Sequence, residues 1–446
     1  MKRLIDYHLS EWKVSTHRKP LILRGARQVG KTHTVRTLGK SFENFVEINF
    51  EFNPDIQIIF EKNLDPVRII QELSLSTKQK ITPGSTLLFL DEIQVQPRAL
   101  TALRYFYEMI PNLHVIAAGS LLDFAIEQVG IPVGRVQSLY MYPVSFMEYL
   151  ASQGYTLLLK SFIQNSTDRF STAIHDKGLA LLGEYLALGG MPEAIQSWID
   201  QEDPLSISTI HQTLLDTYRQ DFNKYAKEHQ IKYLELLFNT IPSQVGNKFK
   251  FSAIPGEYRK RELSPALDLL VTAGIVHRVY HSSGQGVPLG ATTNPDDFKS
   301  IFLDIALGEA LLGNDYAQWF INPHKEFINK GPLVEAFVGQ EILAYENPIM
   351  KKNLYYWHRE SRSSQAEVDY LIQKNTEVVP VEVKSGSGRS LKSLQLFLES
   401  HQASPYGIKF STQEYSFYEK IYSYPLYAIA QAVAHEESRK ALEFLC

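Results

Sequence analysis

The chain has 446 residues, a formal net charge of −4 at pH 7 and a single cysteine, Cys446. This length predicts about two to four domains, and the weak negative charge gives no global reason to bind a polyanion, so any nucleic-acid contact must come from a local patch. One cysteine excludes a disulfide framework and a thiolate metal site. No apolar run reaches the roughly eighteen residues of a membrane span, and we expect a cytoplasmic protein.

The N-terminal stretch, residues 1–13, predicts a packed helix rather than a signal peptide. It begins with basic residues, but Asp6 and Glu11 interrupt it before an apolar core forms. Helical spacing instead places four apolar side chains on one face: Leu4, Ile5, Leu9 and Trp12.

The first motif is a glycine-bounded loop in "LILRGARQVGKTHTVRTLGK" (21–40), where a short apolar run precedes G-x-x-x-x-G-K-[ST]. The loop consists of Gly25, Ala26, Arg27, Gln28, Val29, Gly30, Lys31 and Thr32. Such a loop wraps nucleotide phosphates with backbone N–H groups, and its glycines permit positive φ and close approach. The helix that follows directs its positive dipole end at the anion. The sequence therefore predicts an ATP site.

Two residues of this loop have predicted roles. Lys31 is expected to bridge the β- and γ-phosphates, and the Thr32 hydroxyl is expected to ligate Mg²⁺. The flanks suit this interpretation, because a buried-strand run at 21–23 precedes the loop and residues 33–40 continue as a helix. The alternative is a basic turn between a strand and a helix.

A second strand, in "TLLFLDEIQ" (86–94), ends in Asp91 and Glu92. A buried parallel strand that ends in an acid delivers that acid to the phosphate crevice. Asp91 is expected to hold Mg²⁺ through water, and Glu92 to polarise the attacking water as the general base. A third central strand, in "HVIAAGS" (114–120), ends at Ser120, in position to sense the γ-phosphate.

These segments resemble a known family, and the likeness spans nearly the whole chain. The loop, "FLDEIQ", "AAGSLL" and "PVGRVQSLYMYPVSFMEYL" resemble AAA-type ATPases of bacteria and archaea that are paired with a C-terminal domain of unknown function. The similarity continues in "GGMPEA", "RELSPALDLLVTAGIVHRV", "GPLVEAFVGQEIL" and "EVDYLI…VPVEVKSG". The resemblance implies an ATPase module, a helical lid, a winged-helix-like segment and a nuclease-like C-terminal fold. It implies no particular substrate.

The periodicity predicts an α/β multidomain chain in four blocks. Residues 1–150 alternate strands with helical stretches, the pattern of the parallel sheet of a P-loop ATPase domain. Residues 151–245 have helical periodicity, as in a helical lid or connector. Residues 246–330 contain a short "FKFS" run, a helix-like stretch and the alternating, strand-like "IVHRVYH". That order suits a winged helix, and "SSGQGVPLGATTNPDD" predicts a loop or wing. Residues 331–446 hold a helix and then strands, as in a PD-(D/E)xK-like α/β domain.

Two basic features have alternative interpretations. Arg135, in "IPVGRVQSL", is either an arginine that reaches the γ-phosphate of a neighbouring subunit in a homo-oligomer or a structural surface arginine. The run from Tyr258 to Arg261, "YRKR", begins the expected recognition helix, with Lys248 and Lys250 nearby. One interpretation is that it contacts DNA phosphates. The other is that it is only solvated, because such runs usually are and many winged helices bind proteins instead of DNA.

The C-terminal block contains a hairpin that carries acidic residues. "EVDYLIQ" and "EVVPVEVK" flank "KNTE", a good hairpin loop. Centring the turn on Asn375 and Thr376 places Asp369 directly across from Glu382, with Cβ atoms about 5 Å apart. The opposite face is apolar, so one face gathers two facing carboxylates and Lys384. Facing like charges are costly without a cation, which predicts a Mg²⁺-dependent phosphodiesterase site.

This arrangement resembles the PD-(D/E)xK nuclease fold, and Glu335, in an amphipathic helical stretch, matches the helical acid of that fold. The alternative is an inactive nuclease-like fold, because the same register places Glu367 opposite Lys384 as a surface ion pair. Elsewhere in this half, His277 and His281 lie four apart in a strand-like stretch without a partnering glutamate and predict no metal site.

We therefore expect a Mg²⁺-dependent ATPase that binds ATP and moves a C-terminal nuclease-like or nucleic-acid-engaging module. The first alternative is a nucleotide-gated regulator that binds a partner protein, with an inert C-terminal fold. The second is an ATP-regulated DNA endonuclease, in which the winged-helix-like segment and the C-terminal block both contact DNA.

Overall fold

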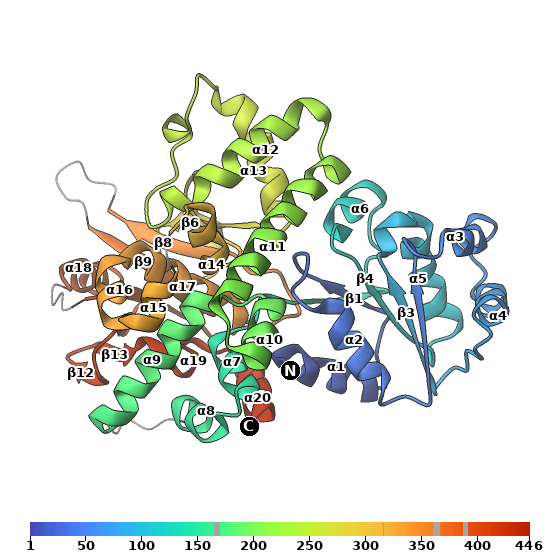
Figure 1. Ribbon diagram of the computed structural model, residues 1–446, viewed down its shortest axis with the longest axis horizontal. Helices are drawn as coiled ribbons and strands as arrows, with labels where there is room; N and C mark the ends of the chain where they lie inside the picture. Colours follow the sequence, from blue (N-terminus) through green and yellow to red (C-terminus); the bar gives the residue numbers. More distant parts are fainter. Residues whose placement is uncertain (165–169, 315, 360–365, 387–390) are drawn as a thin grey trace. The chain divides into compact units, whose positions relative to one another are not determined.

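The computed structural model describes residues 1–164, 170–314, 316–359, 366–386 and 391–446. These residues form two compact units (Figure 1). The N-terminal unit consists of Lys2–Tyr142 and Asn347–Lys351, and the C-terminal unit of Met1, Pro143–Glu346 and Lys352–Cys446. The division does not separate the three blocks predicted within residues 151–446, and these blocks stay predictions.

The N-terminal unit contains a five-stranded, all-parallel sheet in the order β2-β3-β4-β1-β5. Its strands are β1 (Leu21–Arg24), β2 (Asn44–Asn49), β3 (Thr86–Asp91), β4 (His114–Ala118) and β5 (Gln137–Tyr140). Its helices are α1 (Leu4–Val14), α2 (Lys31–Gly39), α3 (Pro54–Glu61), α4 (Pro66–Thr77), α5 (Pro97–Met109), α6 (Leu122–Val129) and the short 3₁₀ helix η1 (Ile93–Val95). The predicted alternation of strands and helices around a parallel sheet is therefore confirmed.

The core of this unit follows the apolar runs of the sequence. The side chains of β3 are buried along the whole strand, as expected for a parallel strand covered on both faces. Strands β2, β3 and β4 share one apolar cluster with α4 and α5, to which Ile48, Leu90, Leu73 and Leu103 belong. The predicted N-terminal helix is confirmed as α1, and its four expected apolar residues are the buried ones: Leu4, Ile5, Leu9 and Trp12.

The C-terminal unit contains an eight-stranded mixed sheet in the order β12-β13-β11-β10-β9-β8-β6-β7. Its strands are β6 (Val276–Ser282), β7 (Thr293–Phe302), β8 (Leu354–His358), β9 (Glu367–Lys374), β10 (Glu377–Lys384), β11 (Gly407–Ser411), β12 (Ser416–Tyr418) and β13 (Ile421–Pro425). The sheet is continuous from the predicted winged-helix block into the predicted nuclease-like block, because β6 pairs with β7 on one side and with β8 on the other.

Helices make up most of the remaining C-terminal unit, as the periodicity of residues 151–245 predicts for its first part. They are α7 (Phe146–Ser152), α8 (Thr156–Ile163), α9 (Thr172–Leu188), α10 (Pro192–Gln201), α11 (Pro204–Tyr225), α12 (Glu228–Thr240), α13 (Lys260–Thr272), α14 (Ile305–Leu311), α15 (Ala317–Ile321), α16 (Pro323–Asn329), α17 (Gly331–Ala344), α18 (Lys392–Ser400), α19 (Ile429–Val433) and α20 (Glu436–Leu445). The described residues of this unit also form four 3₁₀ helices: η2 (Ile241–Gln244), η3 (Phe251–Ala253), η4 (Leu289–Thr292) and η5 (Leu426–Ala428). Among the helices of the described residues, none combines the length and the apolar character that a membrane crossing requires.

The winged-helix block begins irregularly. Lys248, directly before "FKFS", makes one isolated bridge to β7, and the chain then turns into η3, where the Ala253 N–H donates to the Lys250 carbonyl at 3.1 Å. The stretch predicted as a loop or wing, residues 282–297, reaches into strand at both ends: Ser282 belongs to β6, residues 293–297 belong to β7, and Thr293 and Asn294 pair with β6 before a bulge. The helix and strand predicted between these segments are present as α13 and β6.

Candidate nucleotide site and C-terminal carboxylate cluster

The glycine-bounded loop joins β1 to α2 through three residues with positive φ. These φ angles are 147° at Gly25, 62° at Gln28 and 101° at Gly30, and Gly30 is the residue that caps α2. A Cβ atom on Gly25 would lie 2.2 Å from the Met141 carbonyl oxygen, so this position excludes every side chain. At Gly25 the backbone thus has a conformation and a close approach that only glycine allows, whereas Gln28 has a left-handed φ that other residues can adopt.

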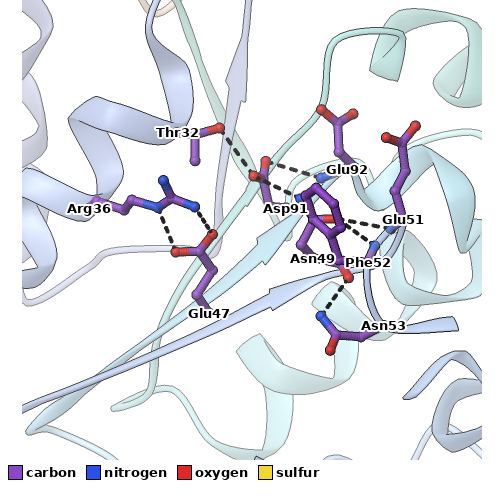
Figure 2. A network of polar contacts seen from close by, with 9 residues as sticks. All are labelled: Thr32, Arg36, Glu47, Asn49, Glu51, Phe52, Asn53, Asp91 and Glu92. Atoms are coloured by element: carbon purple, nitrogen blue, oxygen red, sulfur yellow. Dashed lines mark hydrogen bonds and ion pairs between the residues drawn. The ribbon is translucent and has the colours of Figure 1, made fainter. Parts of the chain in front are cut away.

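Lys31 contacts the loop itself, whereas Thr32 contacts the end of β3. The buried Lys31 ammonium donates to the Gly25 and Ala26 carbonyls at 2.8 and 2.7 Å. Burial lowers the pKa of Lys31 to about 8, against the opposing effect of Glu92 and Asp91. The Thr32 hydroxyl donates to Asp91 Oδ2 at 3.1 Å (Figure 2).

Asp91 is the centre of a polar network at the carboxyl end of β3 (Figure 2). The β2–β3 register places Asn49 beside it, and Asn49 Nδ2 lies 3.4 Å from Asp91 Oδ2. The Glu92 N–H donates to Asp91 Oδ1 at 3.1 Å. Burial, followed by the neighbouring Glu92 charge, raises the pKa of Asp91 to about 6. The sequence analysis missed Asn49, although a polar residue that ends the strand next to β3 is a usable signal.

Glu92 has a left-handed backbone, with φ 50° and ψ 43°. Its Oε2 accepts a hydrogen bond from Gln94 Nε2 at 2.6 Å, and the Ser120 N and Oγ atoms lie 3.4 and 3.5 Å from the same oxygen. The contact with Ser120 follows from the strand order, because β4 lies between β1, which leads into the loop, and β3. The structure therefore brings together Glu92 and Ser120, both of which were predicted for this site, and adds Gln94, which the sequence analysis missed.

Arg135 is not brought to this site. Its Nε donates to Glu108 Oε1 at 2.8 Å on the surface. Arg135 precedes the first residue of β5, so it lies at the edge of the parallel sheet where strands begin, whereas the loop lies where β1 ends. A role for Arg135 in a neighbouring subunit stays a prediction.

A different arginine, Arg3 in the N-terminal segment, makes a hydrogen bond to the backbone of the loop. Arg3 is buried, and its guanidinium donates to the carbonyl oxygens of Val29 and Tyr142, each at 2.8 Å. The first bond holds the backbone of the loop directly. The sequence analysis did not identify this contact, because nothing in a local pattern links residue 3 to residue 29.

In the C-terminal unit, the predicted hairpin register is confirmed. Strands β9 and β10 are antiparallel around Asn375, with Ile372 opposite Val379 and Tyr370 opposite Val381. Asp369 comes directly after the last of these pairs, and its Oδ2 accepts a hydrogen bond from the Val383 N–H at 2.7 Å. If this register is continued by one pair, Asp369 lies opposite Glu382, as predicted.

Glu382 and Lys384 interact with each other at the end of β10. Lys384 Nζ lies 2.5 Å from Glu382 Oε1. Glu382 is buried, and its Oε2 has no hydrogen-bond partner among the described residues. Burial and the charge of Asp369 raise the pKa of Glu382 to about 7. A buried carboxylate oxygen without a donor is suited to a proton or a cation.

A buried lysine that the sequence analysis missed completes the cluster. Lys299, on β7, has Nζ 2.8 Å from Glu335 Oε1, on α17, and 2.5 Å from Glu367 Oε1, on β9. The alternative pairing of Glu367 with Lys384 is therefore wrong, since each of them has a different partner. The available signal was a lysine between the aromatic and aliphatic residues at the end of a strand, "FKSIF".

The charges of the cluster do not cancel. Four carboxylates, on Glu335, Glu367, Asp369 and Glu382, face two ammonium groups, on Lys299 and Lys384. Burial, followed by the charge of Asp369, raises the pKa of Glu335 to about 8, and burial also raises the pKa of Asp369. Burial opposes the charge on Lys299, but the surrounding carboxylates outweigh it and raise the pKa of that ammonium.

The basic run at the start of α13 is partly compensated by acids. Lys260 Nζ lies 2.6 Å from Asp296 Oδ1, and Lys248 Nζ lies 2.5 Å from Asp297 Oδ2. The neighbouring Arg259 is exposed. The basic run is a surface feature, as expected, and DNA contact by it stays a prediction.

Three family models match separate parts of the chain. Residues 17–150 match an AAA domain, and residues 179–318 and 330–429 match two families that are each described as a domain of unknown function, DUF8612 and DUF4143. The first match and the loop geometry support a P-loop AAA-type ATPase domain at the N-terminus. The nuclease-like assignment of the C-terminal block has no such support.

Two solved structures are similar to much of the chain at low identity. A Walker-type ATPase of Pyrococcus abyssi is 13% identical, covers 70% of this chain and 95% of its own, and has a TM-score of 0.44. The Orc1 protein of Aeropyrum pernix in complex with DNA is 14% identical, covers 70% of this chain and 91% of its own, and has a TM-score of 0.30. With TM-scores this low, neither likeness carries an argument. None of the curated proteins matches the chain.

Proposed function

We propose that the protein is a Mg²⁺-dependent ATPase whose nucleotide cycle acts on its C-terminal unit. The observation that carries this proposal is the meeting of the Thr32 hydroxyl and the Asp91 carboxylate, 3.1 Å apart, beside the loop that holds Lys31. A hydroxyl from the loop and a strand-end carboxylate are the oxygen ligands that P-loop NTPases offer to Mg²⁺.

Each residue then has one role in ATP hydrolysis. Lys31 binds the β- and γ-phosphates, Thr32 and Asp91 hold the Mg²⁺ ion, and Glu92 orients and deprotonates the attacking water. The hydrogen bond from Gln94 restrains the Glu92 carboxylate, and Ser120 lies beside it to report the state of the γ-phosphate. When bound, Mg²⁺ would neutralise charge on the phosphate oxygens.

The test of this proposal compares Lys31→Ala with Lys40→Ala. Lys40 is an exposed residue directly after the same helix, so its loss controls for removal of a positive charge from α2. ATP turnover should disappear in Lys31→Ala and persist in Lys40→Ala, and nucleotide affinity should fall only in the first. Equal turnover in Lys31→Ala and the wild type would overturn the assignment.

A second candidate function, phosphodiester hydrolysis, is favoured by the carboxylate cluster. Asp369 and Glu382 are the residues that would hold a divalent ion there, since they are close to one another and Glu382 Oε2 has no donor within the described part of the chain. Glu335 is placed to complete the ligand set only if it exchanges its bond with Lys299. Lys384 would stabilise charge on a scissile phosphate, and the bound ion would activate water.

The test of this second function requires the full chain. An isolated 325–446 segment lacks Lys299 and exposes the edge of β8 that pairs with β6. Mn²⁺ titration without nucleotide should show binding that Asp369→Ala combined with Glu382→Ala abolishes. Glu377→Ala, at the turn end of β10, is the matched control and should keep binding.

The cleavage assay separates the alternatives. Metal-dependent DNA cleavage that Lys384→Ala abolishes would establish a nuclease. Metal binding without cleavage, or a folded chain that binds no metal at this cluster, would favour the nucleotide-gated regulator with an inert C-terminal fold. In that case ATP turnover should rise with a partner protein and not with DNA.

A further inference from the structure

A second group of candidate metal ligands lies on the eight-stranded sheet. It borders the carboxylate cluster, because His358 pairs with Glu367 across β8 and β9, but it shares no residue with that cluster. It consists of His281 near the end of β6, Asp297 on β7 and His358 at the end of β8. One candidate ligand atom from each residue lies within 4.8 Å of the other two. Since β6 is paired with both β7 and β8, three neighbouring strands each contribute one ligand.

This grouping explains why the sequence predicts no metal site at these histidines. His277 and His281 are four residues apart on a strand, which separates them by about 13 Å. They cannot share an ion. The partners of His281 instead come from neighbouring strands, one of which begins more than seventy residues later in the chain.

Tyr356, which is outside the ligand set, orients the Asp297 carboxylate toward His358. The Tyr356 hydroxyl donates to Asp297 Oδ1 at 2.5 Å, and His358 Nε2 lies 3.0 Å from Oδ2. The rings of His281 and His358 lie against each other, with centroids 4.2 Å apart and planes tilted by 35°. Ligating carboxylates in metal sites are commonly held by hydrogen bonds from residues that do not touch the metal. The Tyr356 hydroxyl holds Asp297 Oδ1 in this way and leaves Oδ2 facing the His358 imidazole.

A cation already occupies the rim of this group. Lys248 Nζ lies 2.5 Å from Asp297 Oδ2, and the Lys248 side chain is 47% exposed, whereas that of Asp297 is 10% exposed. The ammonium therefore reaches a mostly buried carboxylate from the solvent side. Because its stem is exposed, Lys248 can leave without repacking the core, which opens a path for a metal ion from solvent.

We propose that His281, Asp297 and His358 bind a transition-metal dication of the Zn²⁺ type and that Lys248 binds the Asp297 carboxylate in its absence. Two imidazoles and one carboxylate suit Zn²⁺, whereas Mg²⁺ prefers ligand sets made of oxygen. Three protein ligands also leave a position for water or a substrate oxygen. This site differs in chemistry from the carboxylate cluster, and the proposal holds whether or not that cluster cleaves phosphodiesters.

The test uses Co²⁺ as a spectroscopic probe on the full chain without nucleotide. We expect a visible absorption band that saturates at one Co²⁺ per chain and disappears when Zn²⁺ is added. The band should be lost in His281→Ala and His358→Ala and retained in His277→Ala, the control on the same strand. Circular dichroism checks that each variant is folded, and His281→Gln replaces His281→Ala if the alanine variant is not.

Lys248→Met separates a metal site from a purely structural polar network. Removal of a competing, partly exposed ion pair should tighten Co²⁺ binding about two- to fivefold. A structural network would instead lose stability and bind no metal. Absence of the band in the folded wild type and in Lys248→Met, or its persistence in both folded histidine variants, would overturn the proposal.

Discussion

Replacement of Lys299 by methionine is the most direct perturbation of the C-terminal unit. Lys299 is 2% exposed, and methionine fills a similar volume without the charge. The variant leaves Glu335 and Glu367 without their cation. The two pairs differ in weight, because the Glu335 side chain is 15% exposed and that of Glu367 is 39% exposed and largely screened by solvent.

The magnitude follows from the Glu335 pair. Removing one partner of a buried ion pair costs about 3–5 kcal/mol. Near pH 7 the cost is lower, about 1.5–3 kcal/mol, because Glu335, whose pKa burial raises to about 8, is largely protonated even beside Lys299, and the variant loses mainly one charge-assisted hydrogen bond. Without Lys299 the pKa of Glu335 rises further. Between pH 8 and 9 the wild-type carboxyl then loses a proton that the variant keeps, so the penalty widens by up to about 1.4 kcal/mol.

Urea denaturation of the full chain at pH 7, 8 and 9 measures this difference. Lys409→Met is the matched control: Lys409 is also buried in the sheet, but its ammonium donates to Gln413 Oε1 at 3.1 Å. It should cost clearly less. Lys299→Met combined with Glu335→Gln should recover part of the loss and remove the added pH dependence. A Lys299→Met chain as stable as the Lys409→Met chain at pH 9 would refute the reasoning.

Three further predictions concern other groups. Glu92→Gln should keep ATP and Mg²⁺ binding but slow hydrolysis by about 10²–10⁴-fold. Asp91→Asn should instead weaken the Mg²⁺-dependent part of ATP affinity, measured by calorimetry. If both variants lose ATP affinity equally, these roles are contradicted. Burial raises the pKa of Glu341 to about 8 from an ordinary 4.5, so the free energy of unfolding should fall as pH rises from about 5 to about 8. Glu341→Gln should lack this part of the fall. If urea denaturation gives the same pH dependence for Glu341→Gln and the wild type, this prediction is wrong. Gly25→Ala should abolish nucleotide binding, because its Cβ would lie 2.2 Å from the Met141 carbonyl; unchanged ATP affinity would show that the loop can move aside.

The sequence by itself determines the features whose residues are close together in the chain. The loop from Gly25 to Thr32 is one contiguous turn between a strand and a helix, and its conformation depends on glycine at both ends. The β9–β10 register follows from the short turn at Asn375 and from alternation of apolar side chains. In both cases a few neighbouring residues restrict the backbone to one arrangement, which a reader of the sequence can reconstruct.

Only the tertiary structure decides which strands are neighbours. The contacts of Lys299 with Glu335 and Glu367, and of Asp297 with His358, join residues whose separation in the chain is 36 to 68 positions. Strand order controls these contacts, and it results from packing apolar faces that are alike in composition and do not specify a partner strand. Local periodicity shows that Lys299 lies in a strand. It does not show that this strand is close enough to Glu367 for an ion pair, because the distance between the two strands depends on strand pairings formed across the whole unit.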